Sequence, residues 1–167
     1  EQYGCSAGGT SHVIASLLAG AEAPSDNDAE GIDDFKRELQ YGAQQEKAIE
    51  DWSRKVGLWT DSVESSLKST LGEKIAEGGE AKVYDNGPTL IKSIGLDYFI
   101  QPILALDRIS LHNTYFPETS MSVIGFGRDE NGSFKIIVEQ PFIEGERVEN
   151  WEIERFMKNM GFELRNP

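Results

Sequence analysis

The sequence has one cysteine, two histidines and no long apolar run. Cys5 has no second cysteine to pair with, so an internal disulfide is excluded and a reducing, cytoplasmic location is expected. His12 and His112 lie in different segments, without a cysteine at ligand spacing, so we expect no metal site. No apolar run approaches the ~20 residues that span a bilayer, so we expect no membrane partner.

Basic charge is also scarce, because 16 lysines and arginines stand against 29 aspartates and glutamates, giving a net charge of −13. Surfaces that bind nucleic acid or anionic lipid need clustered Lys and Arg, so we expect neither as a partner. A nucleotide can still bind such a chain through one lysine, backbone N–H groups and Mg²⁺. The residues are 38% apolar and 27% charged, which is typical of a globular protein.

Residues 1–43 are interpreted as an N-terminal extension and linker that is partly disordered. Residues 1–10 are rich in Gly and Ser, 11–22 place apolar residues at helical spacing, and 22–32 are acidic with Pro and Gly. The chain starts at Glu1 without an initiator methionine, so we expect it to be a piece of a longer protein.

Residues 44–70 are predicted to form a leading helix and a connector. The helical pattern covers about 33–56, with a break or bend near Gly42 and an end at Gly57, a residue suited to helix C-termini. The connector at 58–69 is expected to hold at most one helical turn.

Residues 71–147 change to a strand-rich pattern that predicts an α+β domain. The predicted strands cover 71–77, 82–85, 89–94, 121–126 and 133–139. One helix is predicted between the third and fourth strands, starting at Pro102 and ending near Asn113. The last two strands are joined by 129–132, Asp-Glu-Asn-Gly, a strong hairpin signal.

The most informative stretch is IAEGGEAKVYDNGPTLIK, residues 75–92. It predicts a glycine-bearing β-hairpin, with Gly78 and Gly79 at its turn, that delivers Lys92 onto a following strand. Two interpretations stay open for these residues. The glycines either cover a phosphate or make an ordinary hairpin turn, and the lysine either binds phosphate or is an exposed strand lysine.

This layout resembles the small lobe of a protein kinase, in which a glycine-rich loop covers the phosphates of ATP. Against the family pattern G-x-G-x-x-G-x-V, residues 76–83 read A-E-G-G-E-A-K-V. Gly78 and Val83 match, whereas Ala76 and Ala81 replace the outer glycines. Because alanine resists positive φ, the loop is expected to hold mostly ordinary backbone dihedrals.

The resemblance implies that Lys92 pairs with the α- and β-phosphates and that an acid on the next helix holds this lysine. No glutamate lies in that helix, so Asp107 is the candidate; the alternative is a solvated helix carboxylate. Residues 138–142 correspond to the hinge whose backbone binds adenine. Pro141 removes one N–H donor there, which leaves the carbonyl of Glu139 and neighbouring N–H groups.

Three segments are similar to kinase-like domains in the polyvalent proteins of bacterial mobile elements and phages. They are QQEKAIEDW, LDRISLHNTYFPET and VEQPFIEG, and the likeness covers about 44–167. It implies a five-stranded antiparallel small lobe with one helix over 71–147. Residues 148–167 would then form the first helix of a large lobe that is missing from this chain.

The resemblance implies an atypical protein kinase that binds ATP and phosphorylates Ser, Thr or Tyr of an unknown protein in the full-length parent. Its catalytic Asp, later Asn and Mg²⁺-binding Asp would lie in the missing lobe, so this piece alone is expected to be inactive. The alternative is a degenerate kinase-like scaffold that binds a partner without catalysis; an unrelated α+β interaction domain is a third reading. The candidate site residues are Lys92 and Asp107 for catalysis and Ala76, Glu77, Gly78, Gly79, Ala81, Val83, Lys92, Val138, Glu139, Gln140 and Phe142 for ATP.

Overall fold

The computed structural model describes residues 34–163, so the expectations for 1–33 lie outside the described residues. The helices are α2 (Asp34–Val56), α3 (Val63–Leu71), α4 (Pro102–Tyr115), η2 (Pro117–Thr119, a 3-10 turn) and α5 (Asn150–Asn159). The strands are β1 (Trp59–Asp61), β2 (Ala76–Glu77), β3 (Ala81–Asn86), β4 (Thr89–Gly95), β5 (Ser122–Arg128) and β6 (Phe134–Pro141). The predicted α+β class is confirmed. None of the helices in this range is long and apolar enough to cross a membrane.

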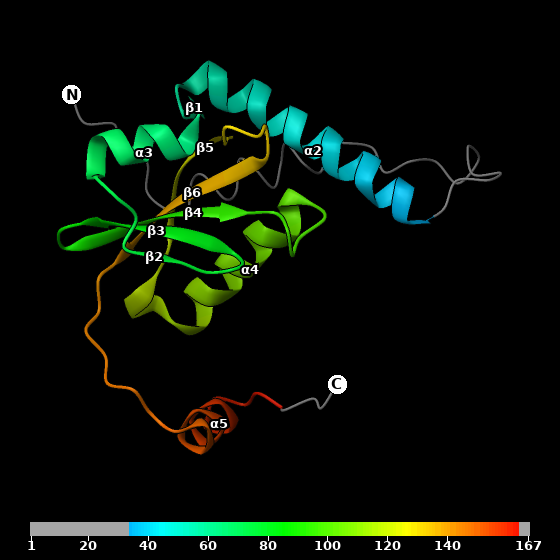
Figure 1. Cartoon of the computed structure of the whole chain (residues 1–167). Coiled ribbons are helices and arrows are strands. Elements are labelled where there is room, and N and C mark those ends of the chain that lie inside the picture. Colours follow the sequence, from blue (N-terminus) through cyan, green and yellow to red (C-terminus); the bar gives the residue numbers. More distant parts are fainter. Residues whose placement is uncertain (1–33, 164–167) are drawn as a thin grey trace.

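The strands form one six-stranded sheet in the order β1-β5-β6-β4-β3-β2 (Figure 1). Strands β2 to β6 pair antiparallel, as the sequence predicted. The edge strand β1 is additional and runs parallel to β5, with Trp59 opposite Phe126. The prediction of five antiparallel strands was therefore incomplete. A strand of three residues is too short to have a recognisable alternation.

The predicted connector at 58–69 is instead β1 followed by most of α3. The two elements meet at Ser62, whose φ of 54° is the sole positive value at a non-glycine residue between 34 and 163. Gly127 in β5 lets this junction lie close, because a Cβ there would be 2.1 Å from the carbonyl oxygen of Thr60. Since α3 extends to Leu71, the first predicted strand is reduced to β2.

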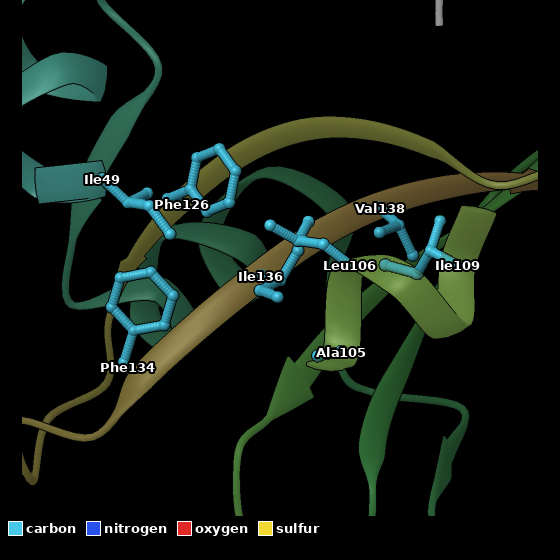
Figure 2. Close-up of a cluster of buried hydrophobic side chains, with 8 residues drawn as sticks. All are labelled: Ile49, Ala105, Leu106, Ile109, Phe126, Phe134, Ile136 and Val138. Carbon is cyan, nitrogen blue, oxygen red and sulfur yellow. The ribbon is translucent and has the colours of Figure 1, made fainter. Parts of the chain in front are cut away.

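The two faces of the sheet carry separate cores. On one face α2 and α4 pack on β5 and β6 through Ile49, Ala105, Leu106, Ile109, Phe126, Phe134, Ile136 and Val138 (Figure 2). On the other, α3 packs through Val63 against Tyr84, Ile91 and Ile137. Because consecutive strand residues such as Ile136 and Ile137 point to opposite sides, the cores lie on opposite faces. We call them the α4 face and the α3 face.

Helix α2 runs without the interruption that was predicted near Gly42. The glycine serves a close approach rather than a bend, because a Cβ there would lie 2.4 Å from the carbonyl oxygen of Ile100. One turn later, the fully buried Gln45 caps α4: its Oε1 accepts from the backbone N–H of Ile103 at 3.1 Å. Its Nε2 donates to Oε1 of Gln101 at 3.2 Å. Gln45 thus connects the side of α2 to the N-terminal end of α4.

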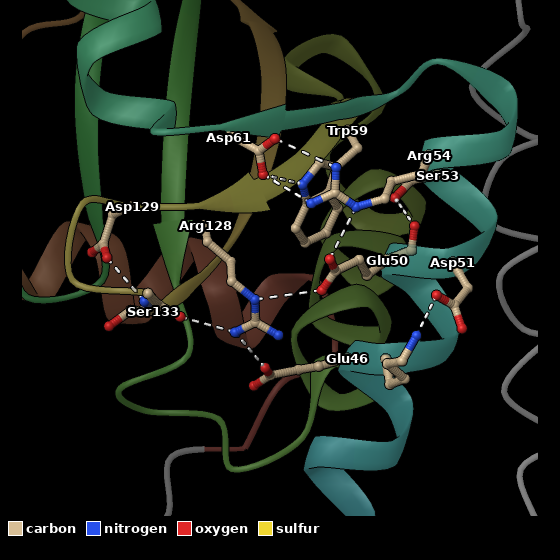
Figure 3. A network of polar contacts seen from close by, with 12 residues as sticks. Glu46, Glu50, Asp51, Ser53, Arg54, Trp59, Asp61, Arg128, Asp129 and Ser133 are labelled. Atoms are coloured by element: carbon tan, nitrogen blue, oxygen red, sulfur yellow. Dashed lines mark hydrogen bonds and ion pairs between the residues drawn. The ribbon is translucent and has the colours of Figure 1, made fainter.

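A chain of ion pairs also ties α2 to the edge of the sheet (Figure 3). Arg128 of β5 contacts Glu46 at 3.1 Å and Glu50 at 3.5 Å. Glu50 also pairs with Arg54 at 3.0 Å, and Arg54 reaches Asp61 of β1 at 2.9 Å. The Arg128 pairs are partly buried and the Arg54–Asp61 pair is exposed; surface pairs of the latter kind contribute about 0–1 kcal/mol each.

Helix α5 lies away from the sheet, at the end of an extended segment that follows β6 (Figure 1). Most of its side chains are exposed, including the apolar Trp151, Ile153 and Phe156. The ring of Phe162 nevertheless lies 4.8 Å from that of Tyr115, at the C-terminal end of α4. One aromatic contact therefore joins this last helical unit to the main body.

Candidate functional site

Strands β2 and β3 form the predicted glycine-bearing hairpin. The N–H of Gly78 donates to the carbonyl of Ala81 at 2.9 Å, which closes the loop. Neither Gly78 nor Gly79 has a positive φ, so the loop holds ordinary dihedrals as Ala76 and Ala81 predicted. A Cβ on Gly78 would have free space, whereas one on Gly79 would lie 2.4 Å from the Tyr98 hydroxyl. The Tyr98 hydroxyl thus packs directly on the backbone of Gly79, and a side chain there would have to displace it.

A row of side chains crosses the sheet beside this hairpin and includes the predicted lysine. Ala76 lies opposite Val83, Val83 opposite Lys92, and Lys92 opposite Val138. Residues directly opposite each other in antiparallel strands point to the same face. Because Val138 belongs to the core under α4, the whole row lies on the α4 face. Candidate residues from four strands are thus neighbours on one face of the sheet.

Lys92 is partly buried on the central strand β4. It has no hydrogen-bond or ion-pair partner within residues 34–163. Loss of solvation by burial lowers the pKa of its ammonium group below the ordinary value of 10.5. A charged group held in this way is less well solvated than in water, and no counter-charge for it lies within the described residues. An anionic ligand on the α4 face would supply that counter-charge.

The expected ion pair between Lys92 and Asp107 is absent. Asp107 is exposed on α4. The helix turns Ala105, Leu106 and Ile109 toward the sheet, and at about 100° per residue this directs position 107 toward solvent. The candidate was chosen by its spacing from the lysine, which does not determine the face of the helix on which an acid lies.

The two acids that flank the glycines are both paired with cations. Glu77 contacts Lys74, and Glu80 accepts from Nη1 of Arg108 in α4 at 2.7 Å. Lys74 holds the pKa of Glu77 below its usual value through this hydrogen bond. An acidic loop would repel phosphate, and pairing reduces that repulsion. Neither partner was identified from the sequence.

The predicted hinge begins inside β6. The side chain of Val138 is fully buried. Glu139 has strand partners on both sides, Ile91 in β4 and Ser122 in β5. Its carboxylate accepts from Oγ1 of Thr89 at 2.9 Å and so points to the α3 face, away from the lysine. The expectation that the carbonyl of Glu139 contacts adenine is therefore corrected, because the backbone at this residue lies between two strands that both pair with it.

Free backbone begins one residue later, because β5 pairs no further along β6 than residue 139. The side chain of Gln140 donates to the carbonyl of Thr119 at 2.8 Å, which fixes this end of β6 against η2. The N–H of Phe142 donates to the carbonyl of Pro88 at 3.1 Å, and the Phe142 ring is exposed. The chain leaves the sheet after Pro141, so the backbone without a β5 partner starts at 140 rather than at 138.

Glu64 of α3 is a structural residue that sequence reasoning missed. Its carboxylate accepts from the Tyr84 hydroxyl at 2.6 Å and the Ser93 hydroxyl at 3.0 Å, and lies 3.4 Å from Nζ of Lys82. Burial, with the bond to Glu64, raises the pKa of Tyr84. Ser93 is next to Lys92, and Lys82 and Tyr84 lie on either side of Val83, the residue that pairs with Lys92. Glu64 therefore holds β3 and β4 in place from the α3 face. No sequence signal marked the contact, since the partners lie far apart along the chain.

A cavity of about 190 Å³ opens beside the hairpin. It is lined by Glu64, Glu77, Gly78, Gly79, Glu80, Ala81, Lys82, Ser93, Gly95, Asp97 and Lys135. Lys82 and Ser93 belong to the α3 face, so this cavity is on the opposite side of the sheet from Lys92. Lys82 and Lys135 are already paired with carboxylates at 3.4 and 3.3 Å. With three further acids in its wall, Glu77, Glu80 and Asp97, this cavity does not suit an anion.

Comparison with known proteins gives one match. The profile of the serine/threonine/tyrosine kinases found in polyvalent proteins matches residues 42–167. No curated protein and no solved structure matches the chain. The match covers the hairpin, the lysine strand, α4 and the segment after β6, and it begins at the glycine where α2 contacts the loop before α4. The chain therefore belongs to the family of serine/threonine/tyrosine kinases found in polyvalent proteins.

Proposed function

We propose that this chain is the ATP-binding small-lobe part of a protein kinase domain. In the longer protein, the domain would transfer phosphate from ATP to Ser, Thr or Tyr of a protein substrate. We place that protein in the cytoplasm and in a bacterial mobile element. The observation that carries the proposal is Lys92, a partly buried cation without a partner in the described chain, next to a glycine-bearing loop.

The residues on the α4 face fit the parts of a nucleotide. Val83, which is partly buried beside the lysine, offers apolar contact to a base or sugar, whereas Val138 on the other side is fully buried in the core and supports the lysine strand from there. The backbone of 77–81 carries the N–H groups for the phosphates, and Lys92 supplies the charge. The adenine edge would be met beyond the end of β5 pairing by the backbone carbonyls that follow Gln140, because Pro141 has no N–H and the N–H of Phe142 donates to Pro88.

Within the described residues we assign binding of the nucleotide but not of a metal ion. No group of three or more His, Cys, Asp or Glu in residues 34–163 could hold a metal ion. In a kinase the metal neutralises charge that develops on the transferred phosphate. Here Lys92 would bind and orient the phosphates, and the apolar α4 face would limit access of water.

Titration with ATP, followed by calorimetry, tests the proposal by comparing wild type with Lys92→Ala. A charge-assisted bond is worth about 1.5–3 kcal/mol, so the variant should bind ATP about tenfold or more weakly. Lys55→Ala is the matched control, because that lysine is exposed on α2. Equal affinity of wild type and Lys92→Ala, or no binding by either, would reject the nucleotide role.

A degenerate, non-catalytic scaffold is the second candidate. It is favoured by the missing acid on α4, because Asp107 faces solvent and α4 therefore supplies no carboxylate to Lys92. The two candidates differ in the longer protein: phosphate transfer from radiolabelled ATP, lost in Lys92→Ala, supports the kinase. ATP binding without transfer supports the scaffold.

A further inference from the structure

The tip of the glycine-bearing loop contacts α4 on one side and the segment between β4 and α4 on the other. On one side the hydroxyl of Tyr98 packs against Gly79, so closely that a Cβ at this position would displace the tyrosine ring. On the other, Glu80 accepts from Nη1 of Arg108 at 2.7 Å. The carbonyl of Glu80 also accepts from the N–H of Gly95 at 2.9 Å, at the end of β4. The loop is therefore attached to the segment that leads into α4.

Arg108 is itself oriented by the core. Its guanidinium lies 5.5 Å from the centre of the Phe99 ring, a distance within the range of cation–π contacts. Phe99 in turn packs against the α4-face cluster. A continuous series of contacts thus runs from that core through Phe99 and Arg108 to Glu80.

We infer that Arg108 is a positioning residue that, through Glu80, holds the glycine-bearing loop in place for the phosphates of the nucleotide. This inference rests on the proposed function. The Arg108–Glu80 pair does two things: it fixes the loop relative to α4, and it neutralises an acid that would otherwise face a phosphate. Adenosine has no phosphate, so its binding does not depend on the pair.

The pair is exposed, with 58% of the Arg108 side chain and 45% of the Glu80 side chain accessible. Such pairs add little to global stability. A loop tip, however, opens locally at small free-energy cost, so one ion pair shifts its population measurably. We therefore expect a local effect on the loop without a change in the unfolding temperature.

The test compares wild type, Arg108→Ala, Glu80→Ala and the double variant, titrated separately with ATP and with adenosine. Each single variant should bind ATP about threefold to fivefold more weakly, the size expected for an exposed pair. The double variant should lose no more than the weaker single variant, because both changes remove one interaction. Adenosine affinity should stay constant in all four. Lys47→Ala, in an exposed ion pair on α2, is the control.

Amide hydrogen exchange in the ligand-free protein provides a second measurement that needs no nucleotide. The amides of Gly78 and Gly95 are bonded to Ala81 and Glu80, and they should exchange faster in Arg108→Ala. Unchanged exchange at both amides overturns the inference, as does an equal loss of ATP and adenosine affinity or additive losses in the double variant. If wild type binds no ATP, the proposed function fails, and so does the statement that Arg108 favours binding of the phosphates. The exchange result then decides only whether Arg108 holds the loop in place.

Discussion

Lys92 is a residue whose charge opposes folding while it prepares a binding site. The group is partly buried, unpaired among the described residues, and has a lowered pKa. Below the pKa of the folded state the full cost of desolvation is present. That cost is relieved as pH rises from the folded pKa to 10.5, the unfolded value, since the unfolded chain binds more protons in this window.

Lys92→Met should therefore stabilise the ligand-free protein at pH 7 by about 1 kcal/mol, the low end for a buried polar group. The gain over wild type should shrink as pH approaches 10.5. Urea unfolding of both proteins at pH 7 and pH 10.5 measures the difference, in which the other titrating groups cancel. The exposed Lys36→Met is the control, and a Lys92→Met that is no more stable than wild type at pH 7 contradicts the argument.

The place of a residue in the site was predicted well where its sequence neighbours determine it. It was predicted poorly where three-dimensional packing determines it. Lys92 was placed on its strand because alternation and turn residues surround it. Asp107 was misassigned because the side of α4 that packs on the sheet is set by a core assembled from distant segments. Arg108, one residue further, makes the loop contact that the sequence could not reveal.

At the scale of elements, turns with a backbone requirement were predicted correctly. Gly57 and Gly132 both have positive φ; the first ends α2 and the second closes the β5–β6 hairpin, at the expected positions. Gly42 was misread because a helical glycine is also used where another backbone comes close. Strand β1 was missed because its partner β5 lies more than sixty residues further along the chain.

Gly42→Ala separates the two interpretations of that glycine. Alanine is the better helix former by about 1 kcal/mol, so a simple bend would predict stabilisation. The contact with the carbonyl of Ile100 predicts the opposite, a loss of about 1–3 kcal/mol from overpacking against rigid backbone. Thermal and urea unfolding decide the sign. Gly78→Ala, with open space around its Cβ, is the matched control and should be nearly neutral.

At the scale of the whole molecule, the folding unit extends further toward the N-terminus than a small lobe over 71–147. Ile49 is fully buried against β5 and β6, Val63 is fully buried on the α3 face, and Gln45 caps α4. All three precede residue 71. The helices ahead of the hairpin are therefore part of the core.

A chain that starts at residue 71 should lose cooperative unfolding, whereas one that starts at 34 should keep it. Each fully buried Ile or Val contributes about 1.5–3 kcal/mol, and domains have only about 5–15 kcal/mol in total. Circular dichroism during urea titration distinguishes the outcomes. A sharp transition in the shorter chain, at the midpoint of the longer one, would show that 34–70 is dispensable.

The parallel pairing of β1 with β5 has a consequence for how quickly the chain folds. Trp59 must find Phe126 after the hairpin, α4 and η2 have been synthesised between them. Pairing across such a separation costs loop-closure entropy before the stabilising contacts can form. Parallel strands with distant partners therefore assemble slowly. Strands β2, β3 and β4 pair with their neighbours in sequence and can form early. The edge strand β1 is therefore expected to join the sheet last, even though the ribosome makes it first.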